Sequence, residues 1–134
     1  MTLILLIEDE PLIAELYRAV LTEGKYEVIT AFNKRSAVEL IERLKPRLVL
    51  LDLMIPIGSG EDFIEYDHPV GFDVLEWIRH HPGCKETKVI VITNLDSDDN
   101  KRMAESLGAV LYLVKAGMEP HELVRHVDSV LSGG

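Results

Sequence analysis

The sequence predicts an α/β protein built around one open, parallel and doubly wound β-sheet. Short apolar runs of strand length alternate with longer segments whose apolar residues recur at helical spacing, which gives five β-then-α units. The runs are nearly continuous in apolar character, as expected for strands covered on both faces. At 134 residues, the chain fits a single domain with one core. We therefore expect five parallel strands in the order 2-1-3-4-5, with helices on both faces.

The first unit begins with the apolar run Leu3–Ile7. Pro11 suits the first turn of the following helix, where a missing amide donor costs nothing, and Gly24 is a suitable end. We expect this helix to bury four residues at helical spacing: Ile13, Leu16, Tyr17 and Val20.

The second unit has a more polar strand, Tyr26–Ala31, which we place near an edge of the sheet. Its helix ends before Pro46, because the residue that precedes a proline is biased away from helical geometry. The expected inward face of this helix consists of Ala37, Leu40, Ile41 and Leu44.

The remaining units follow the same order. Their expected strands are Leu48–Leu51, Val89–Ile92 and Val110–Val114. Their expected helices extend from about Phe72 to His80, from Asp98 to Leu107 and from Glu119 to Leu131. The middle one of these helices has only a thin apolar stripe, so we expect it to be among the easier elements to shift. That stripe consists of Met103, Ala104 and Leu107. We expect this helix, the last strand and the last helix to form the surface that contacts an output partner.

Polar side chains follow four of the strands directly: Glu8 and Asp9, Asp52, Thr93, and Lys115. Ligands of open α/β sheets bind outside the carboxyl ends of the strands, so these residues predict one shared site. The order 2-1-3 places Glu8 and Asp9 beside Asp52, and three carboxylates in one crevice repel unless a proton is retained or a cation is bound. Oxygen ligands alone favour Mg²⁺ over Zn²⁺.

The composition excludes several partners and locations. With 14 Lys and Arg against 23 Asp and Glu, the net charge is −9, which argues against direct binding to nucleic acid. Cys84 is the only cysteine, so no intrachain disulfide forms, and we expect a cytoplasmic protein. The apolar N-terminal run meets acid at Glu8 and has no basic leader, and no run approaches the roughly 20 apolar residues of a membrane span, so we expect no signal peptide and no membrane insertion.

Four strand-end segments are weak motifs singly and specific together: Ile7–Pro11, Leu51–Pro56, Val91–Asn94 and Tyr112–Lys115. In residue type and order they resemble the receiver domain of two-component response regulators. The resemblance covers essentially the whole chain. It implies a flavodoxin-like (βα)₅ fold and a single receiver domain over residues 1–134.

The resemblance also implies the roles of the site residues. Asp52 would accept a phosphoryl group with Mg²⁺ as cofactor, and the protein would catalyse only its own phosphorylation and dephosphorylation. The implied catalytic residues are Asp52, Thr93 and Lys115. The implied metal ligands are Asp9 and Asp52 directly, Glu8 through bound water, and the main-chain carbonyl of Met54. The implied switch residues are Thr93 and Tyr112, although Tyr112 also fits a core residue with a hydrogen-bonded hydroxyl.

The implied phosphoryl donor is a sensor histidine kinase or a histidine phosphotransfer protein, and the output is a changed contact with an unidentified downstream protein. We expect a free-standing receiver, although a receiver cut from a longer protein would have the same sequence. Two other functions stay open. A module that is never phosphorylated would fit the departures described below, and a Mg²⁺-dependent aspartyl-phosphate phosphohydrolase would usually carry a second aspartate where this chain has Met54.

The chain departs from the family pattern at three places. We interpret residues 60–70 as an insertion in the loop after the third strand, acting either as an acidic lid over the site or as a solvated loop. Ala116 stands where the family usually has a proline, and we expect a trans peptide before it. Asn94 is bulkier than usual and would narrow donor access, while Met54 and Leu95 offer no polar group to orient water, which predicts slow self-dephosphorylation.

Overall fold

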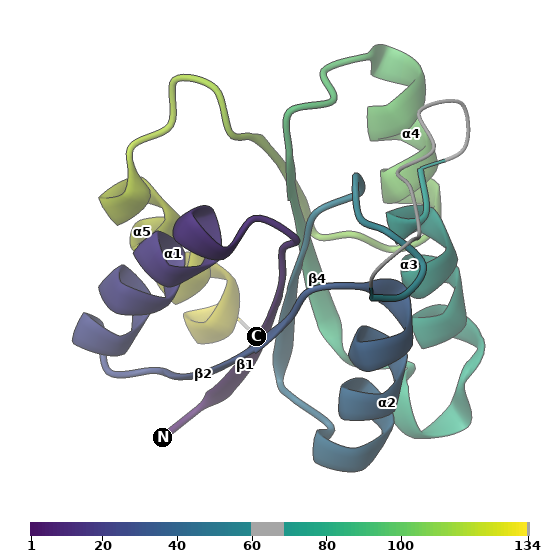
Figure 1. Ribbon diagram of the computed structural model, residues 1–134, viewed down its shortest axis with the longest axis horizontal. Helices are drawn as coiled ribbons and strands as arrows, with labels where there is room; N and C mark the ends of the chain where they lie inside the picture. The colour runs from purple at the N-terminus through teal and green to yellow at the C-terminus, as the bar shows by residue number, and fades with distance from the viewer. Residues whose placement is uncertain (60–68, 134) are drawn as a thin grey trace.

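The computed structural model describes residues 1–59 and 69–133. It confirms the predicted fold class, because five parallel strands form one sheet in the order β2-β1-β3-β4-β5. Helices α1 and α5 cover one face, and α2, α3 and α4 cover the other (Figure 1). The predicted insertion at residues 60–70 lies outside the described residues except for Pro69 and Val70, and so does the acidic lid assigned to it.

The helices and strands agree with the predicted elements to within one or two residues at most ends. The strands are β1 Leu3–Ile7, β2 Glu27–Ala31, β3 Leu48–Leu51, β4 Lys88–Thr93 and β5 Leu111–Val114. The helices are α1 Pro11–Glu23, α2 Lys34–Leu44, α3 Gly71–His80, α4 Asp98–Ser106 and α5 Pro120–Ser132. A short 3₁₀ turn, Pro82–Cys84, precedes β4. None of the helices in the described ranges has both the length and the apolar character of a membrane span.

Both faces of the sheet are buried, and successive strand residues alternate between two apolar clusters. The cluster beneath α2, α3 and α4 includes Leu5, Ile7, Val49, Leu51, Val89 and Val91. The cluster beneath α1 and α5 includes Ile4, Leu6, Leu48, Leu50, Ile90 and Ile92. Each fully buried aliphatic side chain contributes about 1.5 to 3 kcal/mol to folding, which explains why the strands are nearly continuous in apolar residues.

The predicted inward face of α1 is wrong at Leu16. This helix buries Ala14, Tyr17 and Leu21, a stripe rotated from the predicted one, and Leu16 is 50% exposed. Spacing alone did not distinguish the two stripes, because leucines also occur on the solvent side. Gly24 is the C-cap of α1, as predicted.

Helix α3 begins unusually close to the loop that follows β3. The Gly71 N–H donates to the Leu53 carbonyl at 3.0 Å. A β-carbon added to Gly71 would lie 2.5 Å from the Leu53 α-carbon and 2.7 Å from the Asp52 carbonyl oxygen. Only glycine allows this approach, so the helix directly supports the backbone of Asp52.

Candidate functional site

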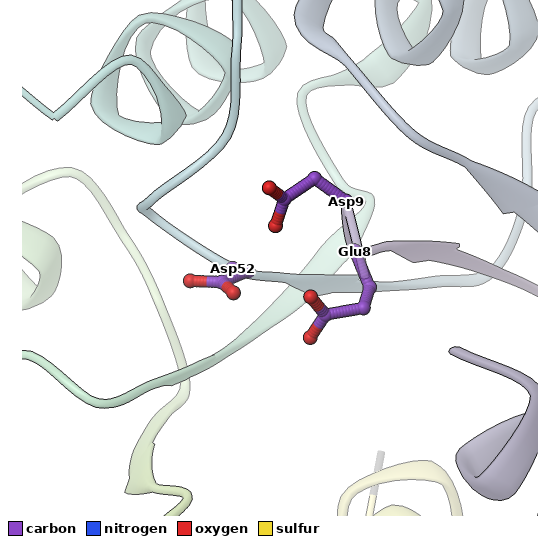
Figure 2. Close-up of side chains that lie close together, drawn as sticks. All are labelled: Glu8, Asp9 and Asp52. Carbon is purple, nitrogen blue, oxygen red and sulfur yellow. The ribbon is translucent and has the colours of Figure 1, made fainter. Parts of the chain in front are cut away.

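Three carboxylates meet at the carboxyl ends of β1 and β3. One oxygen from each of Glu8, Asp9 and Asp52 lies within 4.8 Å of the others. Figure 2 shows their side chains directed toward a shared space. Glu8 and Asp52 are almost fully buried, at 1% and 4% exposure. The register explains the meeting, because Ile7 pairs with Leu51 and the next residues therefore lie side by side.

Lys115 approaches the same carboxylates from the end of β5. Its Nζ donates to Asp52 Oδ2 at 2.6 Å and also to Glu8 Oε1. The Lys115 side chain is only 10% exposed, so the ion pairs are largely shielded from water. The strand-end prediction is therefore correct for these residues, which come together from three separate strands.

These residues line an open pocket of about 340 Å³. Its lining consists of Glu8, Asp9, Glu10, Asp52, Met54, Asn94, Leu95 and Lys115. Met54 also orients the central carboxylate, because its N–H donates to Asp52 Oδ1 at 3.0 Å. Thr93 and Tyr112 belong to the predicted site but are not among the described residues that line this pocket.

The pocket carries more negative charge than one lysine balances. Burial raises the pKa of Glu8 to about 7, with the hydrogen bond from Lys115 opposing this rise and the charge of Asp52 adding to it. Burial, followed by the charge of Asp52, also raises the pKa of Asp9. Burial alone would lower the pKa of Lys115, but Asp52 and Glu8 together outweigh it and the pKa is raised. Without a metal ion, Glu8 is therefore partly protonated near neutral pH, which relieves part of the repulsion among the carboxylates.

The donor set suits a hard divalent cation. All three acidic side chains offer oxygen, and their oxygens are close enough to share an ion. A cation would replace the retained proton and offset the cost of burying these charges. The chemistry of the donors therefore fits Mg²⁺.

Thr93 and Tyr112 both hydrogen-bond to Leu95, in the loop after β4. Thr93 is fully buried, and its Oγ1 accepts a long bond from the Leu95 N–H at 3.5 Å. The Tyr112 hydroxyl donates to the Leu95 carbonyl at 2.7 Å, and burial raises the pKa of Tyr112 to about 12. Leu95 thus connects the two predicted switch residues through its own backbone.

The structure also contains one contact that the sequence did not indicate. Asn94 Oδ1 accepts a hydrogen bond from the Ala116 N–H at 3.1 Å. These residues lie on different loops, so no local pattern could pair them. The peptide that precedes Ala116 is trans, as predicted.

Residues 4–128 match the family model described as response regulator receiver domain. The phosphate regulon transcriptional regulatory protein PhoB of Pseudomonas aeruginosa is 33% identical over 128 residues, which are 96% of this chain and 51% of that protein. The chain therefore spans about half the length of the PhoB proteins it matches.

Two solved structures are similar along nearly their full length. The signal receiver domain of the putative LuxO repressor protein from Vibrio parahaemolyticus is 30% identical, with a TM-score of 0.82 over 98% of this chain and 91% of that one. The BeF₃-activated N-terminal receiver domain of RstA from Klebsiella pneumoniae is also 30% identical, with a TM-score of 0.76 over 95% of this chain and 96% of that one.

Proposed function

Since the chain belongs to the response regulator receiver domain family, and is therefore a phosphoacceptor signalling switch, we propose that Asp52 is the residue that accepts the phosphoryl group. One observation carries this assignment. Asp52 is held between Lys115 Nζ at 2.6 Å and the Met54 N–H at 3.0 Å, inside an acidic pocket that opens to solvent. A carboxylate oriented in this way is a competent nucleophile at neutral pH.

The resident cofactor proposed for this pocket is Mg²⁺. Asp9 and Asp52 would hold the ion directly, Glu8 would act through bound water, and the Met54 main-chain carbonyl would complete the protein ligands. The ion supplies positive charge that neutralises the transferred group. The oxygen donors of the three acidic side chains and the raised pKa of Glu8 support this choice.

In the proposed transfer, an oxygen of Asp52 forms a bond to phosphorus as the phosphorus–nitrogen bond of a phosphohistidine breaks. The histidine nitrogen keeps the electron pair of the broken bond. Lys115 then pairs with the added phosphoryl oxygens, which it can reach because it already contacts Asp52. The aspartyl phosphate carries roughly −1.5 to −2 charge in place of the single negative charge of the Asp52 carboxylate, and it brings new acceptor oxygens to a buried position, enough to rearrange neighbouring polar groups.

The response is proposed to run through Leu95. A phosphoryl group on Asp52 would attract the Thr93 hydroxyl, whose bond to the Leu95 N–H is long and easily replaced. Because Tyr112 donates to the carbonyl of the same Leu95, a shift of this loop changes the position of Tyr112. Tyr112 lines a separate groove of about 460 Å³ beside α4 and β5, which makes this face, together with α5, the proposed output surface.

The wider assignment is also a proposal. The phosphoryl donor would be a sensor histidine kinase or a histidine phosphotransfer protein, and the output would pass to a downstream protein by contact. The net charge of −9 supports a protein partner over nucleic acid for this domain. Receiver domains are signalling modules, and here the only catalysis proposed is self-phosphorylation and self-dephosphorylation, in the cytoplasm. Residues 1–134 would form one domain, with 60–70 as an insertion.

Incubation with acetyl phosphate and Mg²⁺, followed by mass spectrometry, tests the acceptor assignment. We expect one phosphoryl adduct on the peptide that contains Asp52, and none when EDTA removes the metal. Asp52→Asn should abolish the adduct, whereas Asp99→Asn, an exposed control on α4, should retain it. An adduct on another residue of the wild-type protein would overturn the proposal.

A further inference from the structure

Residues 115–118 form a tight turn that carries Lys115 into the pocket. The Met118 N–H donates to the Lys115 carbonyl at 3.1 Å, and Gly117, at the third position, has a φ of +80°. A positive φ at the third position is characteristic of a type II turn, whose second position favours proline. Ala116 occupies that second position, so the turn has the geometry for a proline without its rigidity.

Alanine at this position also has an N–H that a proline would lack, and this N–H donates a hydrogen bond to Asn94 Oδ1. The last main-chain bond between β4 and β5 joins the Lys115 N–H to the Thr93 carbonyl at 2.9 Å. The bond from the Ala116 N–H to Asn94 Oδ1, at 3.1 Å, lies one residue further along each segment. The asparagine side chain thus continues the pairing of the two segments past the end of the sheet.

This additional hydrogen bond is important because the turn positions Lys115. Lys115 is the only residue that brings positive charge to the described lining of the pocket, and it contacts both Glu8 and Asp52. Its backbone is fixed on the N-terminal side by the bond to Thr93. On the C-terminal side it is fixed by the turn bond from the Met118 N–H to its carbonyl and by the bond from the Ala116 N–H to Asn94.

We propose that Asn94 is a positioning residue, which holds Lys115 in the phosphoryl pocket by accepting the Ala116 N–H and so replaces the rigidity of a proline. This inference rests on the proposed function of Asp52 and Lys115. It assigns Asn94 and Ala116 to one functional pair, in which either the side-chain acceptor or a proline would keep the turn in place.

A double-mutant cycle on the phosphorylation rate tests this pairing. Rates with acetyl phosphate and Mg²⁺ would be compared for the wild type, Asn94→Ala, Ala116→Pro and the double variant. Asn94→Ala should lower the rate about three- to tenfold, the range expected from losing one modest hydrogen bond. Ala116→Pro suits the second turn position, so the double variant should stay within about twofold of Ala116→Pro alone. Asn100→Ala, which removes the same side chain from α4, should leave the rate unchanged.

The proposed pairing is wrong if Asn94→Ala is phosphorylated as fast as the wild type or faster. It is also wrong if Asn94→Ala slows phosphorylation of the Ala116→Pro variant by the same factor as it slows that of the wild type. A second measurement needs no phosphoryl donor. Amide hydrogen exchange by NMR should be about three- to tenfold faster at Ala116 in Asn94→Ala, and unchanged exchange would also overturn the inference. If the wild type took no phosphoryl group at Asp52, the proposed function would fail while the exchange rate still reported on this pair.

Discussion

The third and fifth strands of this sheet differ in how deeply their side chains are buried. All four residues of β3 are buried, whereas every residue of β5 is only partly buried. Helix α4, beside β5, has Ala104 as its single buried residue, and Met103 on the same helix is 51% exposed. Asp52 therefore extends from a fully buried strand, while Tyr112 and α4 belong to a more loosely packed part of the described structure. The difference suggests that the chemistry needs a fixed acceptor and that the response needs an element that moves at small cost.

Truncating one side chain in each region measures this contrast most strongly. Leu50 on β3 is fully buried, so Leu50→Ala should lower the free energy of unfolding by about 2 to 5 kcal/mol. Met103→Ala should change it by no more than about 0.5 kcal/mol, because the side chain is half exposed. Urea unfolding in the absence of metal measures both values. Equal losses would show that α4 is packed as firmly as β3.

Removing Lys115 tests how strongly the pocket depends on its cation. Lys115→Ala leaves Glu8 and Asp52 buried without a counter-charge, and should lower the free energy of unfolding by about 3 kcal/mol in EDTA. Excess Mg²⁺ should restore part of this loss. Lys101→Ala is the matched control, because its pair with Asp96 is exposed and contributes about 0 to 1 kcal/mol. Similar losses for both variants would contradict the buried character of the pocket.

Gly71 tests the rigidity of the loop that holds the acceptor. Gly71→Ala forces a β-carbon against the backbone of Leu53, and we expect a loss of about 1 to 3 kcal/mol together with slower phosphorylation. Gly83→Ala is the control, since its β-carbon would meet only the flexible end of the Lys45 side chain, whose Nζ lies at 2.8 Å. Thermal unfolding compares the two variants. A stable Gly71→Ala protein would mean that the start of α3 can retreat from Asp52.

The effect of pH on Mg²⁺ affinity should be smaller than the effects of the substitutions above, but it reports directly on the protonation of Glu8. The pKa of Glu8 is raised to about 7 from its ordinary 4.5, so the folded, metal-free protein keeps a proton that the unfolded chain has lost. Ionising Glu8 therefore costs stability progressively from pH 4.5 to about 7, and Mg²⁺ binding must displace the proton below pH 7.

Calorimetric titration should show Mg²⁺ affinity rising about tenfold between pH 6 and pH 8, the effect of releasing one proton. In Glu8→Gln this dependence should become nearly flat. A wild-type affinity that does not vary over this range would mean that Glu8 is already ionised without metal.

The sequence was sufficient for the strands and for the acidic part of the site. The apolar runs end directly at Glu8, Asp52 and Lys115, and parallel register then brings these ends together. It was insufficient where one side chain competes with another or where distant loops touch. Leu16 satisfied the helical spacing but faces solvent, and the bond between Asn94 and Ala116 depends on how two loops meet.

Chemical-shift mapping by NMR, with Mg²⁺ and then beryllofluoride as a phosphoryl mimic, tests the central claim most directly. In the proposed switch, a fixed acceptor that follows β3 drives a response in the lightly packed α4 and β5. We predict that Mg²⁺ shifts amides near Glu8, Asp9 and Asp52, and that beryllofluoride adds large shifts at Thr93, Leu95, α4 and β5, with small ones in β2 and the C-terminal half of α1. No further shift with beryllofluoride, or shifts of equal size in β2 and α4, would contradict it.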